Sequence, residues 1–212
     1  MRTIGSCPRC EILARFFYTG KSAPCVISRA AAILEIPMET KRRPVIKLGV
    51  VDFGVETAEL PSGVVVDLPV IRHPGAAAIV ALDTDGTIAM LTQWRHAIGA
   101  WMREIPAGCR NAGEDFLTCA RRELGEEAAL SAARWDRLGA IVTIPSFCDE
   151  RIELFLAREL SPGAGELDHD EVIRVSRVPF NETFAMIERG EIVDAKTITA
   201  LYRARDFLTR SH

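Results

Sequence analysis

The sequence predicts an α+β fold, because strand patterns fill most of its middle, one helical pattern interrupts them and two helical patterns end the chain. The apolar runs at 76–82 and 87–92 flank Asp83-Thr-Asp-Gly86, and the Asp-Gly pair is typical of a tight hairpin turn. Residues 114–129 then change to the spacing of an amphipathic helix.

Three runs rich in β-branched residues precede this hairpin and predict a small antiparallel sheet over residues 45–75. The runs cover residues 45–51, 55–60 and 64–71. The last two runs are separated by Pro61-Ser-Gly63, a composition that favours a turn.

Three strands and two helices are expected after the central helix. The strands are expected at 136–144, 151–158 and 171–178. Asn181 and Asp194 are good N-cap residues, so helices are expected to follow them over 182–189 and 195–208. Residues 76–212 are therefore predicted to form one core.

The composition indicates one globular domain, predicted over residues 41–212. The chain has 212 residues, 48% of them hydrophobic and 26% charged, which excludes a disordered or collagen-like protein. No apolar run approaches the ~18 residues that span a bilayer, so no membrane partner is expected. The net charge of −3, without a block of Lys and Arg, argues against a nucleic-acid partner.

The cysteines of the chain indicate its compartment. Six scattered cysteines are too few for a disulfide scaffold at this length and are expected to be reduced. The first residues lack the charged and apolar regions of a signal peptide. Together these observations predict a cytoplasmic location.

Residues 1–40 differ from the rest, because they show no sustained strand or helix period. Cys7-Pro-Arg-Cys10 has the spacing of half a zinc knuckle, but no second pair follows at a matching spacing, so a zinc site is not expected. Two interpretations stay open. The segment is a poorly ordered extension with at most one short helix over 26–36, or it is not native because the natural protein begins at Met38.

Three carboxylates stand out in the expected central helix. At about 100° per residue, Glu123, Glu126 and Glu127 fall within an arc of about 100°, at the edge of the apolar face. Like charges so close repel one another, and a divalent cation with a preference for oxygen ligands, such as Mg²⁺ or Mn²⁺, offsets that repulsion. The alternative is a solvated acidic face paired with Arg121 and Arg122.

The spacing around these carboxylates closely resembles the Nudix box, a signature of hydrolases that act on nucleoside diphosphates linked to another moiety. The motif runs through Gly108, Glu114, Arg122-Glu123-Leu124, Glu126-Glu127 and Leu130. One position departs from the family pattern, because Ala129 stands where the family has glycine. The resemblance covers about residues 45–205 and implies an α/β/α sandwich around a mixed sheet.

The resemblance also implies roles for the residues of the motif. Glu123, Glu126 and Glu127, with the main-chain carbonyl of Ala107, are the implied ligands of two or three Mg²⁺ or Mn²⁺ ions, and Glu126 is also a candidate catalytic residue. Structural support of the helix and its ligands is implied for three others, Gly108, Glu114 and Arg122.

Features outside the box are similar to the ADP-ribose pyrophosphatase group. They are Gln93-Trp-Arg95, Glu104-Ile-Pro-Ala-Gly108 and a loop at Pro145 to Glu150 that follows Leu130 at that group's spacing. The implied reaction is hydrolysis of ADP-ribose to AMP and ribose 5-phosphate. Two alternatives remain, a Nudix hydrolase of another nucleotide sugar, such as ADP-glucose or GDP-mannose, and a non-catalytic Nudix ligand sensor.

Three residues outside the box are expected at the substrate. Arg95 is a candidate phosphate contact, unless it only pairs with a carboxylate of the box. Glu104 is expected to contact substrate or to support the metal site. Glu150 is the candidate general base, unless it is a loop carboxylate paired with Arg151. His73, before Pro-Gly, is expected to be a turn residue.

The resemblance finally implies a homodimer. Nudix hydrolases of nucleotide sugars are commonly homodimers whose N-terminal strands contribute to the neighbour's site, and residues 45–71 have the required strand character.

Overall fold

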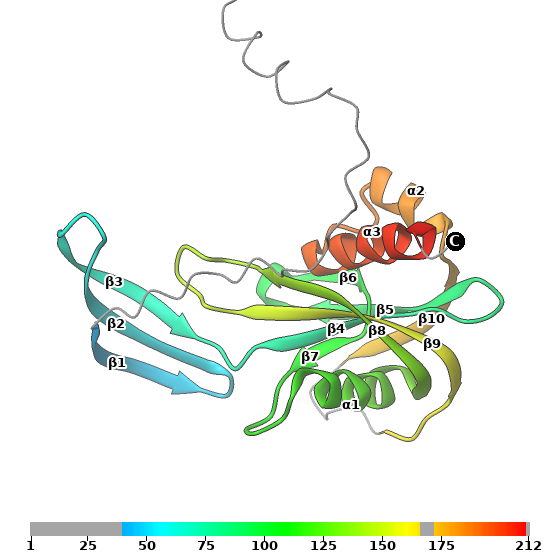
Figure 1. Cartoon of the computed structure of the whole chain (residues 1–212), viewed down its shortest axis with the longest axis horizontal. Helices are drawn as coiled ribbons and strands as arrows, with labels where there is room; N and C mark the ends of the chain where they lie inside the picture. The colour runs from blue at the N-terminus through cyan, green and yellow to red at the C-terminus, as the bar shows by residue number, and fades with distance from the viewer. Residues whose placement is uncertain (1–39, 166–171, 211–212) are drawn as a thin grey trace, which may run out of the picture. The chain divides into compact units, whose positions relative to one another are not determined.

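The computed structural model describes residues 40–165 and 172–210, and within them it confirms the predicted α+β fold (Figure 1). The predictions for the N-terminal extension, including the half zinc knuckle and the helix over 26–36, lie outside the described residues. In the described part of the chain, no helix is long and apolar enough to cross a membrane.

The N-terminal part forms a three-stranded antiparallel sheet. Its strands are β1 (Thr40–Leu48), β2 (Val51–Glu59) and β3 (Val65–Arg72), in the order β1-β2-β3. The prediction of one strand over 45–51 is wrong, because the chain turns at Gly49, whose φ of 56° lies in the left-handed region that glycine favours. The expected turn at 61–63 is present, and Gly63 N–H donates to the Leu60 carbonyl.

Two further sheets form the core. Their strands are β4 (Ala76–Ala81), β5 (Thr87–Arg95), β6 (Ala100–Glu104), β7 (Ala107–Cys109), β8 (Leu130–Val142), β9 (Arg151–Pro162) and β10 (Ile173–Pro179). One sheet has the order β7-β4-β9-β8 and is mixed, because β4 and β9 are parallel and the other pairs antiparallel. The other has the order β10-β5-β6 and is antiparallel.

The helices α1 (Phe116–Ala128) and α3 (Ala195–Arg210) cover opposite faces of the mixed sheet (Figure 1). The helix α2 (Glu182–Glu188) packs against α3 and β10. Every residue of β4 is buried. Ala78 and Val80 pack in the core on the α3 side, whereas Ala77 and Ile79 pack against α1. A strand covered on both faces reads as a continuous apolar run, which explains the sequence of β4.

The helix ends follow from local hydrogen bonds. Asp115 caps α1 by accepting from the backbone N–H of Leu117 and Thr118, and Asp194 accepts from Thr197 N–H at the start of α3, as expected. Asn181 is the residue that precedes α2, as expected, but its backbone is helical, with φ −68° and ψ −29°, and its side chain makes no cap hydrogen bond. The 3₁₀ turn η1 (His96–Ile98), β6 and β7 were not predicted.

Candidate functional site

The C-terminal half of α1 brings together the three carboxylates predicted as metal ligands. Glu123 and Glu127 are buried, with 7% and 2% of their surface exposed, whereas Glu126 is half-buried. Burial follows from the helix pattern, because both lie beside the apolar face that packs on the sheet. Glu127 Oε2 accepts the backbone N–H of Ala107 at 2.7 Å, which joins the helix to β7.

Gly108 gives room to one of these carboxylates. A Cβ at this position would lie 2.2 Å from the carboxyl carbon of Glu123, far inside van der Waals contact. Only glycine therefore lets the Glu123 carboxylate lie against the backbone of β7.

Arg122 offsets the negative charge of the cluster. Its Nη1 lies 2.7 Å from both Glu123 Oε1 and Glu126 Oε2, and its Nε lies 3.1 Å from Glu114 Oε1. Its Nη2 donates to the Cys109 carbonyl at 2.8 Å. The contacts with the three carboxylates, above all the hydrogen bond to Glu114, raise the pKa of Arg122 above its ordinary value.

The donors present fit a divalent metal ion in their chemistry. Carboxylate oxygens are the ligands that Mg²⁺ and Mn²⁺ prefer, and the missing Cβ of Gly108 lets the Glu123 carboxylate lie against the backbone of β7. No three His, Cys, Asp or Glu side chains among the described residues already converge as a metal site. Because Arg122 bridges Glu123 and Glu126, we expect metal binding to require separation of these ion pairs.

A second charged group lies at the end of β5. Arg95 donates to both oxygens of Glu104, at 2.8 and 2.6 Å, and Lys196 from the start of α3 also contacts Glu104. Glu104 is only 1% exposed. Burial alone would raise the pKa of Glu104, but the hydrogen bond from Arg95 and the charge of Lys196 lower it below 4.5.

This group differs in part from the expectations. The alternative in which Arg95 pairs with a carboxylate of the box is not what the structure shows, because its partner is Glu104. Glu127 nevertheless lies close enough for its charge to raise the pKa of Arg95, after the larger effect of the hydrogen bond to Glu104. Lys196 was not predicted, because no local pattern distinguishes it from a surface lysine.

Glu150 lies on the loop between β8 and β9. The pKa of the Cys109 thiol is raised to about 11, first by burial and then by the charges of Glu150 and Glu123. The alternative in which Glu150 pairs with Arg151 is not observed, because Arg151 contacts Glu153 at 2.7 Å.

His73 is more than the turn residue that was expected. Its Nε2 lies 3.6 Å from Glu150 Oε1 and 3.5 Å from Cys109 Sγ. Only the folded chain brings these residues together, because they come from three segments far apart in the sequence.

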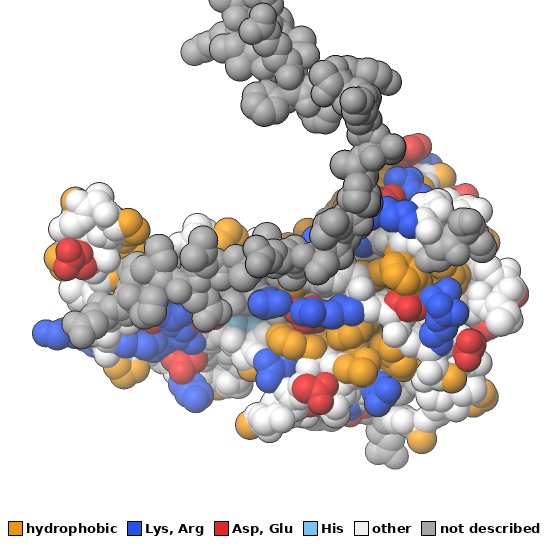
Figure 2. All heavy atoms as spheres, in the orientation of Figure 1, with side chains coloured by type: hydrophobic (Ala, Val, Ile, Leu, Met, Phe, Trp, Pro, Cys, Tyr) orange, Lys and Arg blue, Asp and Glu red, His pale blue; other side chains and the backbone are white. Residues whose placement is uncertain are grey.

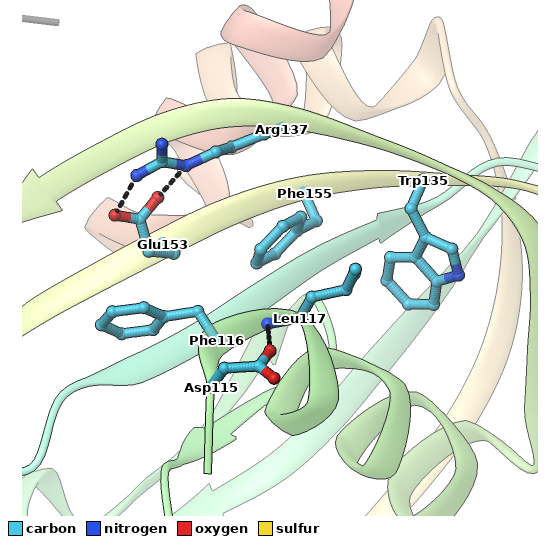
Figure 3. Close-up of a pocket in the computed structure, with 7 residues that line it drawn as sticks. All are labelled: Asp115, Phe116, Leu117, Trp135, Arg137, Glu153 and Phe155. Atoms are coloured by element: carbon cyan, nitrogen blue, oxygen red, sulfur yellow. Dashed lines mark hydrogen bonds and ion pairs between the residues drawn. The ribbon is translucent and has the colours of Figure 1, made fainter.

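A separate pocket lies between the start of α1 and the strands β8 and β9 (Figure 3), with a volume of about 370 Å³. Its apolar wall consists of four residues, Phe116, Leu117, Trp135 and Phe155. Its charged residues include Glu153, whose oxygens accept from Arg137 at 2.7 Å. None of the predicted site residues lines this pocket.

On the face of the molecule drawn in Figure 2, acidic side chains lie next to basic ones.

Comparisons with known proteins identify the family to which this site belongs. A family model described as the NUDIX domain matches residues 72–201. The chain is 38% identical to an ADP-ribose pyrophosphatase of Bacillus subtilis (strain 168) and 36% identical to a methanol dehydrogenase activator of Bacillus methanolicus. Each of these alignments spans 154 residues, or 72% of this chain and 83% of the relative. A crystal structure of an ADP compounds hydrolase matches with a TM-score of 0.71 at 19% identity, over 82% of this chain and 95% of that one, which shows the same fold.

Proposed function

The chain belongs to the Nudix family, and from this premise we propose that it is a metal-dependent hydrolase that converts ADP-ribose to AMP and ribose 5-phosphate. The observation that carries the proposal is the set of three carboxylates in the C-terminal half of α1, two of them buried against β7. A cytoplasmic site of action fits the free thiols of Cys109, Cys119 and Cys148.

Glu123, Glu126 and Glu127, with the carbonyl of Ala107, would hold two or three Mg²⁺ or Mn²⁺ ions. The chemistry that such ions would supply is neutralisation of the pyrophosphate oxygens and stabilisation of the leaving group. Arg122 then keeps its contacts with Glu114 and the Cys109 carbonyl, which fix the position of α1 relative to β7.

The basic residues orient the pyrophosphate. Glu104 holds the guanidinium of Arg95 in one plane by two hydrogen bonds, so the side chain loses little further freedom when a phosphate binds. Lys196 adds a second positive charge to the same buried carboxylate. Glu104 thus acts in this proposal by positioning Arg95 and Lys196.

Glu150 takes the proton of the attacking water. The oxygen of that water bonds to one phosphorus, the bond from this phosphorus to the bridging oxygen breaks, and each product keeps one phosphate. Glu150 contacts His73, and His73 contacts Cys109, the residue after Gly108 of the box, and this position supports the role.

A product assay tests the proposal. The protein is incubated with Mg²⁺ and, in parallel, with ADP-ribose, ADP-glucose and GDP-mannose, and the products are separated by chromatography. We expect AMP and ribose 5-phosphate from ADP-ribose, formed faster than products of the other two. Turnover only of another nucleotide sugar would replace the substrate, whereas tight binding without turnover would favour a ligand sensor.

The protein is also proposed to be a homodimer that associates through the N-terminal sheet. Large apolar side chains are exposed there, with exposed fractions between 39% and 74%. They include Val45, Ile46, Leu48, Val65 and Leu68. Several exposed large apolar side chains on one small sheet support an interface between subunits.

A further inference from the structure

Two residues from different parts of the chain contact the carboxylate of Glu150. Thr143 Oγ1 donates to Glu150 Oε2 at 2.5 Å, and His73 Nε2 lies 3.6 Å from Glu150 Oε1. Each oxygen of the carboxylate therefore has its own neighbour, and only 23% of the Glu150 side chain is exposed.

The ring of His73 is oriented by the turn that follows it. The backbone N–H of Gly75 donates to His73 Nδ1 at 3.1 Å. Nδ1 is therefore an acceptor, so the neutral ring carries its proton on Nε2, the atom that faces Glu150 and the sulfur of Cys109. The side chain is only 10% exposed, which limits its other rotamers.

The backbone around Glu150 is joined to the same turn. Asp149 accepts the backbone N–H of His73 at 2.8 Å and the guanidinium of Arg72 at 3.0 Å. The backbone N–H of Ile71 also donates to the Phe147 carbonyl at 2.7 Å. The loop that carries Glu150 is thus held against the end of β3.

Thr143 reaches Glu150 because of the strand register. Val142, the last residue of β8, pairs with Arg151, the first residue of β9. Thr143 and Glu150 are the next residues on each side, and the intervening loop is closed by a hydrogen bond from Cys148 N–H to the Ile144 carbonyl. The two side chains therefore face each other at the mouth of this loop.

We propose that Thr143 and His73 are positioning residues that hold the Glu150 carboxylate in place to accept the proton of the attacking water. This inference rests on the proposed function, in which Glu150 is the general base. Neither residue needs to touch substrate, because they act by limiting the rotamers of Glu150. A misplacement of about 1 Å is enough to slow such a step strongly.

The test compares matched variants of each residue. Thr143→Val keeps the shape of threonine and removes the hydroxyl, whereas Thr143→Ser keeps the hydroxyl. His73→Leu removes the donor, whereas His73→Gln keeps an N–H near the place of Nε2. The kcat and KM for ADP-ribose are measured with Mg²⁺, and Tm is measured for each variant to check that it folds. If a variant of one residue does not fold, the two variants of the other residue still test the proposal.

We expect Thr143→Val and His73→Leu each to lower kcat about tenfold with little change in KM. Thr143→Ser and His73→Gln are expected to recover most of that loss. Glu150→Gln alone should lower kcat by about a hundredfold. In the Glu150→Gln background Thr143→Val should cause no further loss, because no base remains to be positioned.

Three results would overturn the inference, and they are distinguishable. If Glu150→Gln lowers kcat but neither Thr143→Val nor His73→Leu does, only the positioning role fails. The same holds if Thr143→Val lowers kcat by the same factor in the Glu150→Gln background. If Glu150→Gln itself leaves kcat unchanged, the assignment of Glu150 in the proposed function fails as well.

Discussion

Ala129 occupies a backbone conformation that suits glycine better. It ends α1 in the left-handed region, with φ 51° and ψ 41°, and its N–H donates to the Gly125 carbonyl at 2.9 Å. A left-handed conformation costs an L-residue about 1–2 kcal/mol. The family's glycine at this position is explained by this geometry, and the alanine here makes the helix end less stable.

We therefore expect Ala129→Gly to raise the free energy of unfolding by about 1 kcal/mol, measured by urea denaturation. The matched control is Ala128→Gly, one residue earlier and inside the helix. That change should lower the free energy of unfolding by about 1 kcal/mol. A loss of stability in Ala129→Gly would show that the strain at this position is not significant.

The sequence shows that alanine replaces the family's glycine at position 129, but it does not show the backbone strain there. The spacing of a motif gives residue types only, whereas the sign of φ depends on how the helix joins the following strand. The same limit applies at Gly108, whose motif position was recognised while its contact with the Glu123 carboxylate became visible only in the fold.

At the scale of elements, α3 contributes to the site through its first turn. Asp194 caps the helix, and Lys196 in that turn contacts both Asp194, at 3.1 Å, and the buried Glu104. The helix start therefore both stabilises α3 and places a positive charge beside Arg95. This contact joins residues that are 92 positions apart in the sequence.

Because Lys196 contacts Glu104, we expect the free energy of unfolding to depend on pH. The pKa of Glu104 is below 4.5 because Arg95 and Lys196 together outweigh the effect of burial. A lowered carboxyl pKa stabilises the fold above the unfolded-state pKa, and this contribution is lost as the pH falls through the folded-state value. Lys196→Met should raise the pKa of Glu104 and remove part of that contribution.

We expect the difference in unfolding free energy between wild type and Lys196→Met to be largest near pH 7 and to shrink as the pH falls below about 4. Urea denaturation at a series of pH values measures it. The exposed Lys47, which lies 3.9 Å from Asp52, provides the control Lys47→Met, with little effect at any pH. A difference for Lys196→Met that stays constant with pH would contradict the account.

Most elements could be predicted from the sequence, because periodicity and caps are local. The turn after β4, the central helix and the cap at Asp194 all follow from neighbouring residues. The hairpin predicted around that turn is wrong, because β4 and β5 join different sheets and share only the isolated bridge between Leu82 and Ile88. The neighbours of Glu104 and Glu150 could not be predicted in this way. Lys196, Thr143 and His73 reach these carboxylates through strand register and helix packing, which no local pattern encodes.

At the scale of the whole molecule, the N-terminal sheet is expected to mediate dimerisation. Leu48 is 74% exposed and Val65 is 62% exposed on this sheet. Introducing charges there should prevent association, because an unpaired charge is costly to bury in an interface. We expect Leu48→Glu/Val65→Glu to have the molecular mass of a monomer.

Light scattering after size-exclusion chromatography measures that mass. Val193→Glu is the control, since Val193 is equally apolar and 62% exposed but lies outside the N-terminal sheet. It should have the mass of the dimer, as should the wild type. A monomeric wild type, or a double variant that is still dimeric, would contradict the proposed interface.

The central claim is that the carboxylates of α1 catalyse the hydrolysis of ADP-ribose, and one assay of AMP release tests it most directly. Glu127→Gln is compared with wild type and with Glu188→Gln, a change of an exposed glutamate on α2, at saturating Mg²⁺. The account predicts that Glu127→Gln loses at least about a hundredfold in rate, whereas Glu188→Gln keeps the wild-type rate. Equal rates of AMP release from all three proteins would contradict it.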